Sequence, residues 1–194
     1  MNWEIIMALL LGLGLSASCG FRVFVPLLVT AVATHFGWFP GMIHNQFAWM
    51  GTLPAIIAFG SASVLEILGY YIPVVDNALD AVASPLAVIA GALLATSVLP
   101  IDNDLLKWGL GIIVGGGSAG IVQSGTVFTR LLSSKATLTT GNAVVSTGEN
   151  VAATAGALLS LILPIITGIA ALILVLVMGR YAVKRFRKMK IGES

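Results

Sequence analysis

The residues that could do chemistry in this chain are a few charged side chains set in long apolar segments. Arg22 ends the run Ser16-Ala-Ser-Cys-Gly-Phe-Arg22, and Pro26 follows it. An unpaired arginine inside a membrane helix costs about 2.5–3.5 kcal/mol. The small residues and Pro26 predict a broken helix, whose second half would present free N–H groups that attract anions. Because a guanidinium binds oxyanions through two hydrogen bonds, the pattern indicates a site for an anionic or phosphate-bearing solute. The alternative is that Arg22 only pairs with an acidic residue and locks the fold.

A second glycine-rich stretch, Gly115-Gly-Gly-Ser-Ala-Gly120, precedes Gln123 and Ser124. Each glycine costs a helix about 1 kcal/mol relative to alanine. Two interpretations stay open: an unwound segment that lines a pathway, or a small-residue surface at which helices pack closely. Under the first interpretation, the expected substrate-binding residues are Arg22, Ser16, Ser18, Cys19, Gly20, Ser118, Gln123 and Ser124.

Four acidic residues are candidates for proton or ion coupling: Glu66, Asp76, Asp80 and Glu149. An ionisable residue inside the membrane is a functional candidate by default. Asp76 and Asp80 are four residues apart and share a face if they are helical. Two neighbouring carboxylates repel, which favours retention of a proton on one of them. The alternative is structural, with Glu66 acting as a cap or as the partner of Arg22.

Other chemistries lack the residues that they need. Cys19 is the one cysteine, which excludes an internal disulfide and a cysteine-based zinc site. His35 and His44 have no clear third ligand, so we expect no metal site. The chain has no phosphate-binding loop, no metalloprotease motif and no hydrolase nucleophile motif. We therefore expect no cofactor and no enzymatic activity, and a lipid-modifying membrane enzyme is the third choice of function.

The elements that position these residues are predicted to be membrane helices. The 194 residues are 58% hydrophobic and 9% charged, whereas soluble domains are about 45–50% apolar and about 25% charged. This composition excludes most soluble enzymes and nucleic-acid-binding proteins. A spanning helix needs about 20 apolar residues. We expect an all-α polytopic protein of about six transmembrane helices, with spans near 3–35, 49–71, 78–99 and 105–132 and two more that meet near Pro164.

Details of these spans are also predicted. The first is interrupted by its small residues, a short loop covers 73–77, and Asp102 or Asn103 caps the fourth span. Residues 142–183 are either two helices, which we favour, or a re-entrant polar segment followed by one long kinked helix.

Short similarities indicate two unequal halves, 1–100 and 101–183, followed by a basic tail, 184–194. Gly14-Leu-Ser-Ala17 resembles Gly116-Gly-Ser-Ala119, and Gly91-Ala-Leu-Leu94 recurs at Gly156. Halves separated by three crossings would be inverted, as in many secondary transporters.

The positive charges predict the orientation. Lys and Arg are enriched in cytoplasmic loops, so the tail lies in the cytoplasm and six crossings would place the N-terminus there too. The expected location is the bacterial cytoplasmic membrane. The expected partners are the bilayer, anionic lipid headgroups at the tail and a second copy through small-residue helix faces, with no nucleic acid.

The combined motifs resemble an uncharacterised bacterial multi-pass membrane family, domain of unknown function 4126. The resemblance rests on the run that ends at Arg22, on Glu66, on Asp76-Asn77, on the glycine-rich stretch and on Ser146-Thr-Gly-Glu-Asn150. It covers nearly the whole chain and implies a membrane protein without an established activity. A looser similarity is to DedA-type lipid-carrier transporters, whose Gly-Arg-Phe-x-Pro motif is spaced differently from Gly20-Phe-Arg-Val-Phe-Val-Pro26.

Two functional hypotheses follow from these observations. The first is a small transporter or channel for an anionic or phosphate-bearing solute, coupled to protons, with Arg22 holding the anion. The second is a non-transporting scaffold or assembly subunit, in which the glycines serve only helix packing.

Overall fold

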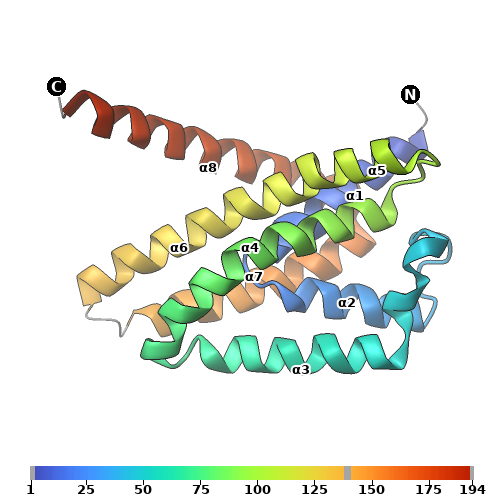
Figure 1. Ribbon diagram of the computed structural model, residues 1–194, viewed down its shortest axis with the longest axis horizontal. Coiled ribbons are helices and arrows are strands. Elements are labelled where there is room, and N and C mark those ends of the chain that lie inside the picture. The colour runs from blue at the N-terminus through green and yellow to red at the C-terminus, as the bar shows by residue number, and fades with distance from the viewer. Residues whose placement is uncertain (1–2, 138–140, 193–194) are drawn as a thin grey trace.

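The computed structural model describes residues 3–137 and 141–192, and every regular element in these ranges is helical (Figure 1). The all-α prediction is confirmed for this part of the chain. The α-helices are α1 (Trp3–Cys19), α2 (Phe24–His35), α3 (Leu53–Gly69), α4 (Pro73–Val98), α5 (Asp104–Leu110), α6 (Gly117–Thr137), α7 (Asn142–Ile162) and α8 (Pro164–Gly192). A 3-10 helix, η1 (Asn45–Gly51), precedes α3, and a π-helical segment, η2 (Gly111–Gly116), joins α5 to α6.

Helices α1 and α2 turn back on each other, and we call them the re-entrant pair because α2 returns to the end of the bundle at which α1 begins. The chain reverses at residues 20–23, in the middle of the bundle (Figure 1). Ala8 of α1 lies beside Leu99, and the His44 N–H after α2 donates to the Ser97 carbonyl at 2.8 Å. Leu99 and Ser97 are both at the C-terminal end of α4, so α1 begins and α2 ends at the same end of the bundle. The prediction of one interrupted crossing over 3–35 is therefore wrong, because the chain turns back at the break.

The expected loop at 73–77 is also wrong. Pro73 begins α4, a position that proline tolerates because the first helical N–H has no partner within the helix. Asp76 and Asp80 therefore lie on consecutive turns of one helix and share a face. As expected, Asn103 caps α5, because its side chain accepts a hydrogen bond from the Leu106 N–H at 2.9 Å.

The second glycine-rich stretch stays helical. Segment η2 runs from α5 into α6 without a break, and its glycines face α4. A Cβ atom on Gly91 would lie 2.7 Å from the Gly115 carbonyl oxygen, and one on Gly111 would lie 3.0 Å from the Ala92 carbonyl oxygen. The close-packing interpretation is therefore confirmed, and the interpretation of an unwound segment is wrong.

The last part of the chain forms two helices that meet beside Pro164, as favoured from the sequence. Helix α7 ends at Ile162 and α8 begins at Pro164. Only 11% of Pro164–Tyr181 is buried, and α8 diverges from α6 toward its C-terminus (Figure 1).

The surface is apolar and the interior contains charges. Large hydrophobic side chains are exposed on α3, α4, α7 and α8, whereas Arg22, Lys107 and Arg130 are buried. This is the reverse of a soluble protein. Three helical segments of the described residues are long and apolar enough to cross a membrane, and the pair η1 and α3, bent by 62°, would be a fourth if it forms one span. Six spans and inverted halves are not confirmed by these segments. The three segments are Ala78–Val98, Asp104–Ser133 and Pro164–Tyr181.

Candidate functional site

One network of buried charged and polar side chains lies around the α1–α2 turn. It joins this turn to the C-terminal end of α3, the first turns of α4, the second half of α6 and the first half of α7. We call it the ionic network. Its members are Arg22, Glu66, Tyr70, Asp76, Asp80, Arg130, Asn142, Glu149 and Asn150.

Arg22 is 1% exposed and is held almost entirely by α7. Its Nη1 donates to Glu149 Oε2 at 2.9 Å, its Nε to Asn150 Oδ1 at 2.5 Å, and its Nη2 to the Ser146 carbonyl at 3.2 Å. Helix α7 therefore satisfies three of the five N–H donors of this guanidinium. In this structure Arg22 pairs with an acidic residue, as the alternative interpretation of the sequence proposed.

Arg130 of α6 is the second cation of the ionic network, and it is 2% exposed. It donates to both carboxylate oxygens of Glu149. Its Nη1 also donates to Asp80 Oδ1 at 2.6 Å and to Asp76 Oδ1 at 3.3 Å. Asn142 Nδ2 donates to the other Asp76 oxygen at 2.8 Å. One guanidinium thus joins the α3–α4 turn to α7, and Glu149 is shared between the two arginines.

Tyr70 lies against both arginines. The guanidinium carbons of Arg22 and Arg130 are 4.0 and 3.8 Å from the centroid of its ring. A desolvated guanidinium over an aromatic face gains about 2 kcal/mol, so the ring helps to hold two like charges in one site. The Tyr70 hydroxyl donates to Asp80 Oδ1 at 3.1 Å.

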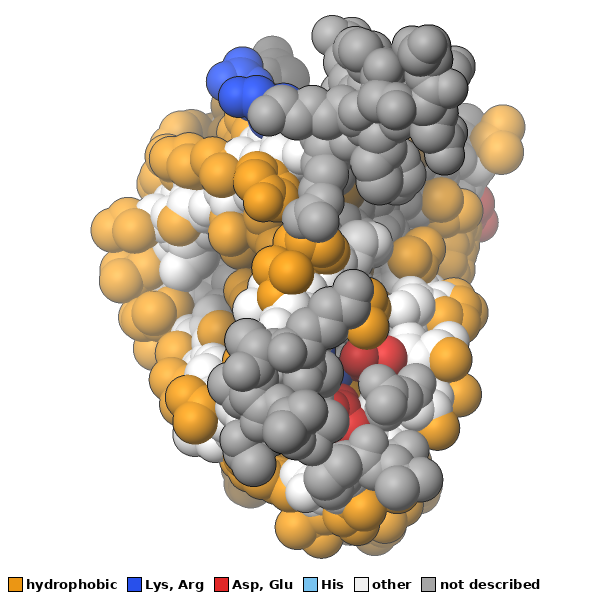
Figure 2. Space-filling view, turned by 90° about the vertical axis from the view of Figure 1, so that its left-hand side faces the viewer, with side chains coloured by type: hydrophobic (Ala, Val, Ile, Leu, Met, Phe, Trp, Pro, Cys, Tyr) orange, Lys and Arg blue, Asp and Glu red, His pale blue; other side chains and the backbone are white. Residues whose placement is uncertain are grey.

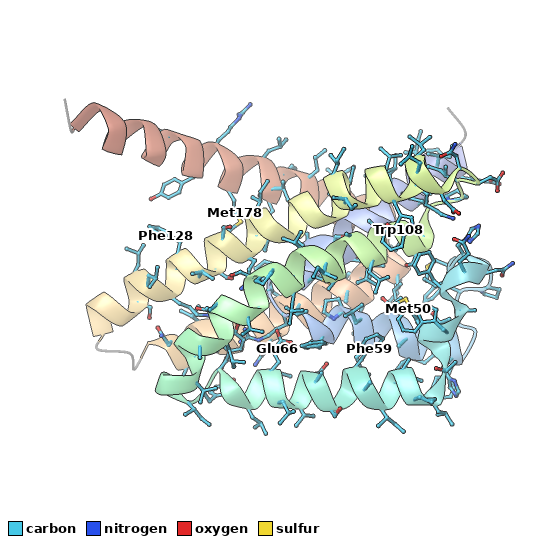
Figure 3. The ribbon with its side chains drawn as sticks, in the orientation of Figure 1. Met50, Phe59, Glu66, Trp108, Phe128 and Met178 are labelled. Atoms are coloured by element: carbon cyan, nitrogen blue, oxygen red, sulfur yellow. The ribbon has the colours of Figure 1, made fainter. Side chains whose placement is uncertain are left out.

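Glu66 caps the second half of the re-entrant pair. Its two carboxylate oxygens accept from the N–H groups of Val23 at 2.8 Å and Phe24 at 3.0 Å. The first N–H groups of a helix have no partner within it, and leaving them bare in apolar surroundings is costly. Glu66 is drawn between α3 and the helices above it (Figure 3). The anion expected at this half-helix N-terminus is therefore the carboxylate of Glu66 itself.

The ionic network contains more acidic than basic groups. Two arginines face four carboxylates, so its formal charge is −2 when all of them are ionised. The side chain of Asp80 is 13% exposed, whereas those of Asp76 and Glu149 are 3% and 6% exposed. Figure 2 looks onto the end of the bundle where α4 begins, and it shows acidic atoms near the centre of that face. Of these three carboxylates, that of Asp80 is therefore the nearest to the surface.

The structure does not gather the other expected substrate-binding residues of α1 around Arg22. Ser16 donates to the Gly91 carbonyl at 2.7 Å and joins α1 to α4, and Ser18 donates to the Gly14 carbonyl of its own helix. Cys19 is fully buried in the apolar core. Gly20 packs so closely on α6 that a Cβ atom would lie 2.6 Å from the Ala119 carbonyl oxygen.

The expected residues of α6 are dispersed in the same way. Ser118 donates to the Gly115 carbonyl at 2.9 Å and Ser124 to the Gly120 carbonyl at 2.7 Å, so both hydroxyls serve their own helix. Ser124 is exposed and Gln123 is buried. A role for these residues in binding a solute stays a prediction. Of the candidate residues, Arg22 and the four carboxylates are the ones that the structure brings together.

Sequence reasoning missed two central residues, Arg130 and Tyr70. A signal was present for Arg130, since it lies among apolar residues in Val127-Phe-Thr-Arg-Leu-Leu132, like Arg22 in the run before Pro26. The sequence carries no signal for Tyr70, because its role depends on two arginines from other segments.

The described residues also include two histidines away from the ionic network. His35 Nδ1 is 2.8 Å from the Gly51 carbonyl oxygen, and His44 lies in the loop before η1. No group of three His, Cys, Asp or Glu side chains in 3–137 and 141–192 is arranged to hold a metal ion.

Residues 9–184 match the family described as Domain of unknown function (DUF4126). The chain belongs to this family. The match spans the whole ionic network of this DUF4126 protein, from Arg22 to Asn150. No curated protein and no solved structure matches the chain, so the looser similarity to DedA-type transporters has no support from these comparisons.

Proposed function

We propose that this DUF4126 protein is a small membrane transporter that moves an anionic or phosphate-bearing solute together with protons. The observation that supports the proposal is the ionic network, where two arginines and four carboxylates are buried at the turn of a re-entrant helix pair. Irregular backbone at membrane depth occurs where it is buried in protein or lines a cavity, and buried ionisable groups mark ion and substrate pathways.

The formal charge of the ionic network is the reason that we expect anion uptake to be coupled to proton uptake. With all carboxylates ionised the formal charge is −2, and an added anion would make it −3. Burying further unpaired charge is strongly unfavourable, so an anion is expected to bind only when carboxylates take up protons. Glu149 is the acceptor that both arginines share. Once Glu149 is protonated, its hold on Arg22 and Arg130 weakens, and a phosphate or carboxylate can bind the two guanidinium groups bidentately.

The proposal includes a topology with five crossings, by α3, α4, the continuous α5–α6, α7 and α8. Helices α1 and α2 enter from one side without crossing. The basic tail, with Arg180 and Lys184, places the C-terminal end in the cytoplasm, next to anionic lipid headgroups of the bacterial cytoplasmic membrane. Because α1 begins at the end of the bundle opposite the C-terminus (Figure 1), the N-terminal end lies outside. This replaces the expected six crossings with both termini inside.

Flux in proteoliposomes tests the proposal. The purified protein is reconstituted with a pH-sensitive dye inside, and phosphate, phosphate esters and small carboxylates are added outside. We expect at least one anion to enter with protons, and we expect Glu149→Gln to abolish this uptake. Glu4→Gln is the matched control, because Glu4 is exposed at the start of α1. The proposal would be contradicted if none of the tested anions were taken up, or if uptake did not depend on the pH gradient.

The second candidate is a non-transporting scaffold, in which the ionic network only fastens the helices. Close packing of glycines between α4 and η2 favours this alternative. A scaffold predicts no flux of any anion, and it predicts that Arg22→Lys and Glu149→Gln change only stability. Under both candidates we propose that the protein is not an enzyme.

A further inference from the structure

Asp80 differs from Asp76 and Glu149, its acidic neighbours in the ionic network, in how much of its side chain is exposed. Its side chain is 13% exposed, about twice the value for Glu149 and four times the value for Asp76. It lies two turns into α4, at the end of the bundle where α4 begins and α6 ends (Figure 1). Figure 2 shows acidic atoms at the surface of this end.

Asp80 is connected to the rest of the ionic network through one arginine and one tyrosine. Arg130 of α6 donates to Asp80 Oδ1, and the hydroxyl of Tyr70, which follows α3, donates to the same oxygen. Asp76, on the same helix, shares the Arg130 Nη1. Glu149 of α7 binds the other side of Arg130, and Arg22 lies over the Tyr70 ring. A proton added to Asp80 thus changes the charge that faces both arginines.

At the opposite end of the bundle a separate cluster of side chains joins α5 to η1. Lys107 of α5 is fully buried, and its Nζ lies 2.8 Å from Gln46 Oε1 of η1 and 3.0 Å from Asp104 Oδ1. Phe47 and Trp108 pack beside it with ring centroids 6.0 Å apart. Met50 and Trp108 mark this end in Figure 3, away from Glu66.

We infer that Asp80 is the group through which the ionic network exchanges protons with water, and that this exchange takes place only at the end of the bundle where α4 begins and α6 ends. The inference rests on the proposed proton-coupled transport and names its point of proton entry. In the step, a hydronium ion transfers its proton to an Asp80 carboxylate oxygen and leaves water. The neutral carboxyl then holds Arg130 less tightly, and Arg130 keeps Asp76 and Glu149 as partners.

Carboxyl labelling in oriented vesicles tests the access. A membrane-impermeant carbodiimide with a charged amine converts an accessible carboxyl group into an amide, which peptide mass spectrometry locates. We expect Asp80 to be labelled from the side of the C-terminal tail, with little label on Asp76, Glu66 or Glu149. Asp104 is the control for sidedness, since its side chain is 63% exposed at the opposite end. Label on Asp80 from the Asp104 side, or from neither side while Asp104 reacts, would overturn the inference.

A flux measurement separates failure of the inference from failure of the proposed function. We expect Asp80→Asn to lose the proton dependence of uptake, Asp80→Glu to retain most of it, and Asp104→Asn to leave it unchanged. If the wild type takes up anions with protons and Asp80→Asn does so equally well, the inference is wrong and the proposed function stands. If Asp80 is labelled as expected but no anion moves, the proposed function fails instead. Asp80→Glu preserves the charge and so provides a folded variant if Asp80→Asn does not fold.

Discussion

The two glycine-rich segments of this chain, residues 11–23 and 109–120, have similar sequences and opposite structures. The first ends α1 and reverses the chain at 20–23, whereas the second continues as a π-helical segment between α5 and α6. At the first, Glu66 accepts the N–H groups that the reversal frees, and α7 binds Arg22. At the second, Gly111, Gly115 and Gly116 lie against the backbone of α4. Glycine therefore permits a break, but a break forms only where other segments satisfy the freed backbone groups.

The largest expected effect on stability comes from replacing Arg22, which lies where the chain reverses between α1 and α2. Arg22→Met removes the cation and leaves Glu149 and Asn150 without one of their donors. Breaking a buried ion pair costs about 3–5 kcal/mol, and we expect a loss of that size in the free energy of unfolding, measured by denaturant titration in micelles. Lys184→Met, at an exposed position of α8, is the matched control and should change little. An unchanged stability for Arg22→Met would mean that Arg22 does not fasten the re-entrant pair.

The next largest expected effect is the loss of stability when Glu66, which caps α2 at the break, is replaced. Glu66→Ala leaves the N–H groups of Val23 and Phe24 without acceptors, at about 1–3 kcal/mol each. Glu66→Gln keeps one acceptor oxygen and should lose about half as much. The change in the midpoint of thermal unfolding measures both variants against Ser61→Ala, an exposed position of the same helix. Equal midpoints for the alanine and glutamine variants would contradict the role of the carboxylate as a cap.

The smallest expected effects on stability are in the second glycine-rich segment, which stays helical. Their sign depends on which glycine is replaced. In Gly115→Ala the new methyl group would meet the Ala95 methyl and the backbone of Gly91, and overpacking of this kind costs about 1–3 kcal/mol. Gly117→Ala, two residues further along, faces open space and should stabilise the helix by up to about 1 kcal/mol. Thermal unfolding of the two variants checks the opposite signs. A loss of stability in both would mean that this segment needs glycine for its backbone conformation and not for packing.

Several features were predictable because each depends on a local pattern. Pro164 separates two helices, Asn103 caps α5, and Arg22 lies at a break. The four acidic residues that the sequence singled out all lie in the ionic network together with Arg22. The choice between broken and continuous helix in the second glycine-rich segment was not predictable, because it depends on whether a partner from another segment is present.

The direction of the chain after the break was also beyond local reasoning. Residues 3–35 have the length and composition of a long interrupted crossing, and the same composition fits two short helices that turn back. Two observations decide between these structures: Ala8 and Leu99 line one pocket, and the His44 N–H donates to the Ser97 carbonyl. In the proposed topology this reversal changes the number of crossings from six to five, so the proposed position of the N-terminus changes with it.

The sequence by itself determined the class of this protein. A chain with 9% charged residues and long apolar segments folds as helices in an apolar solvent, and its few internal charges must find partners. Which partners they find was decided by the tertiary structure. Tyr70 and Arg130 became central because the α1–α2 turn, α3, α4, α6 and α7 bring two guanidinium groups and four carboxylates together. Charge attraction acts across space and not along the chain, so the ionic network exists only in the folded bundle.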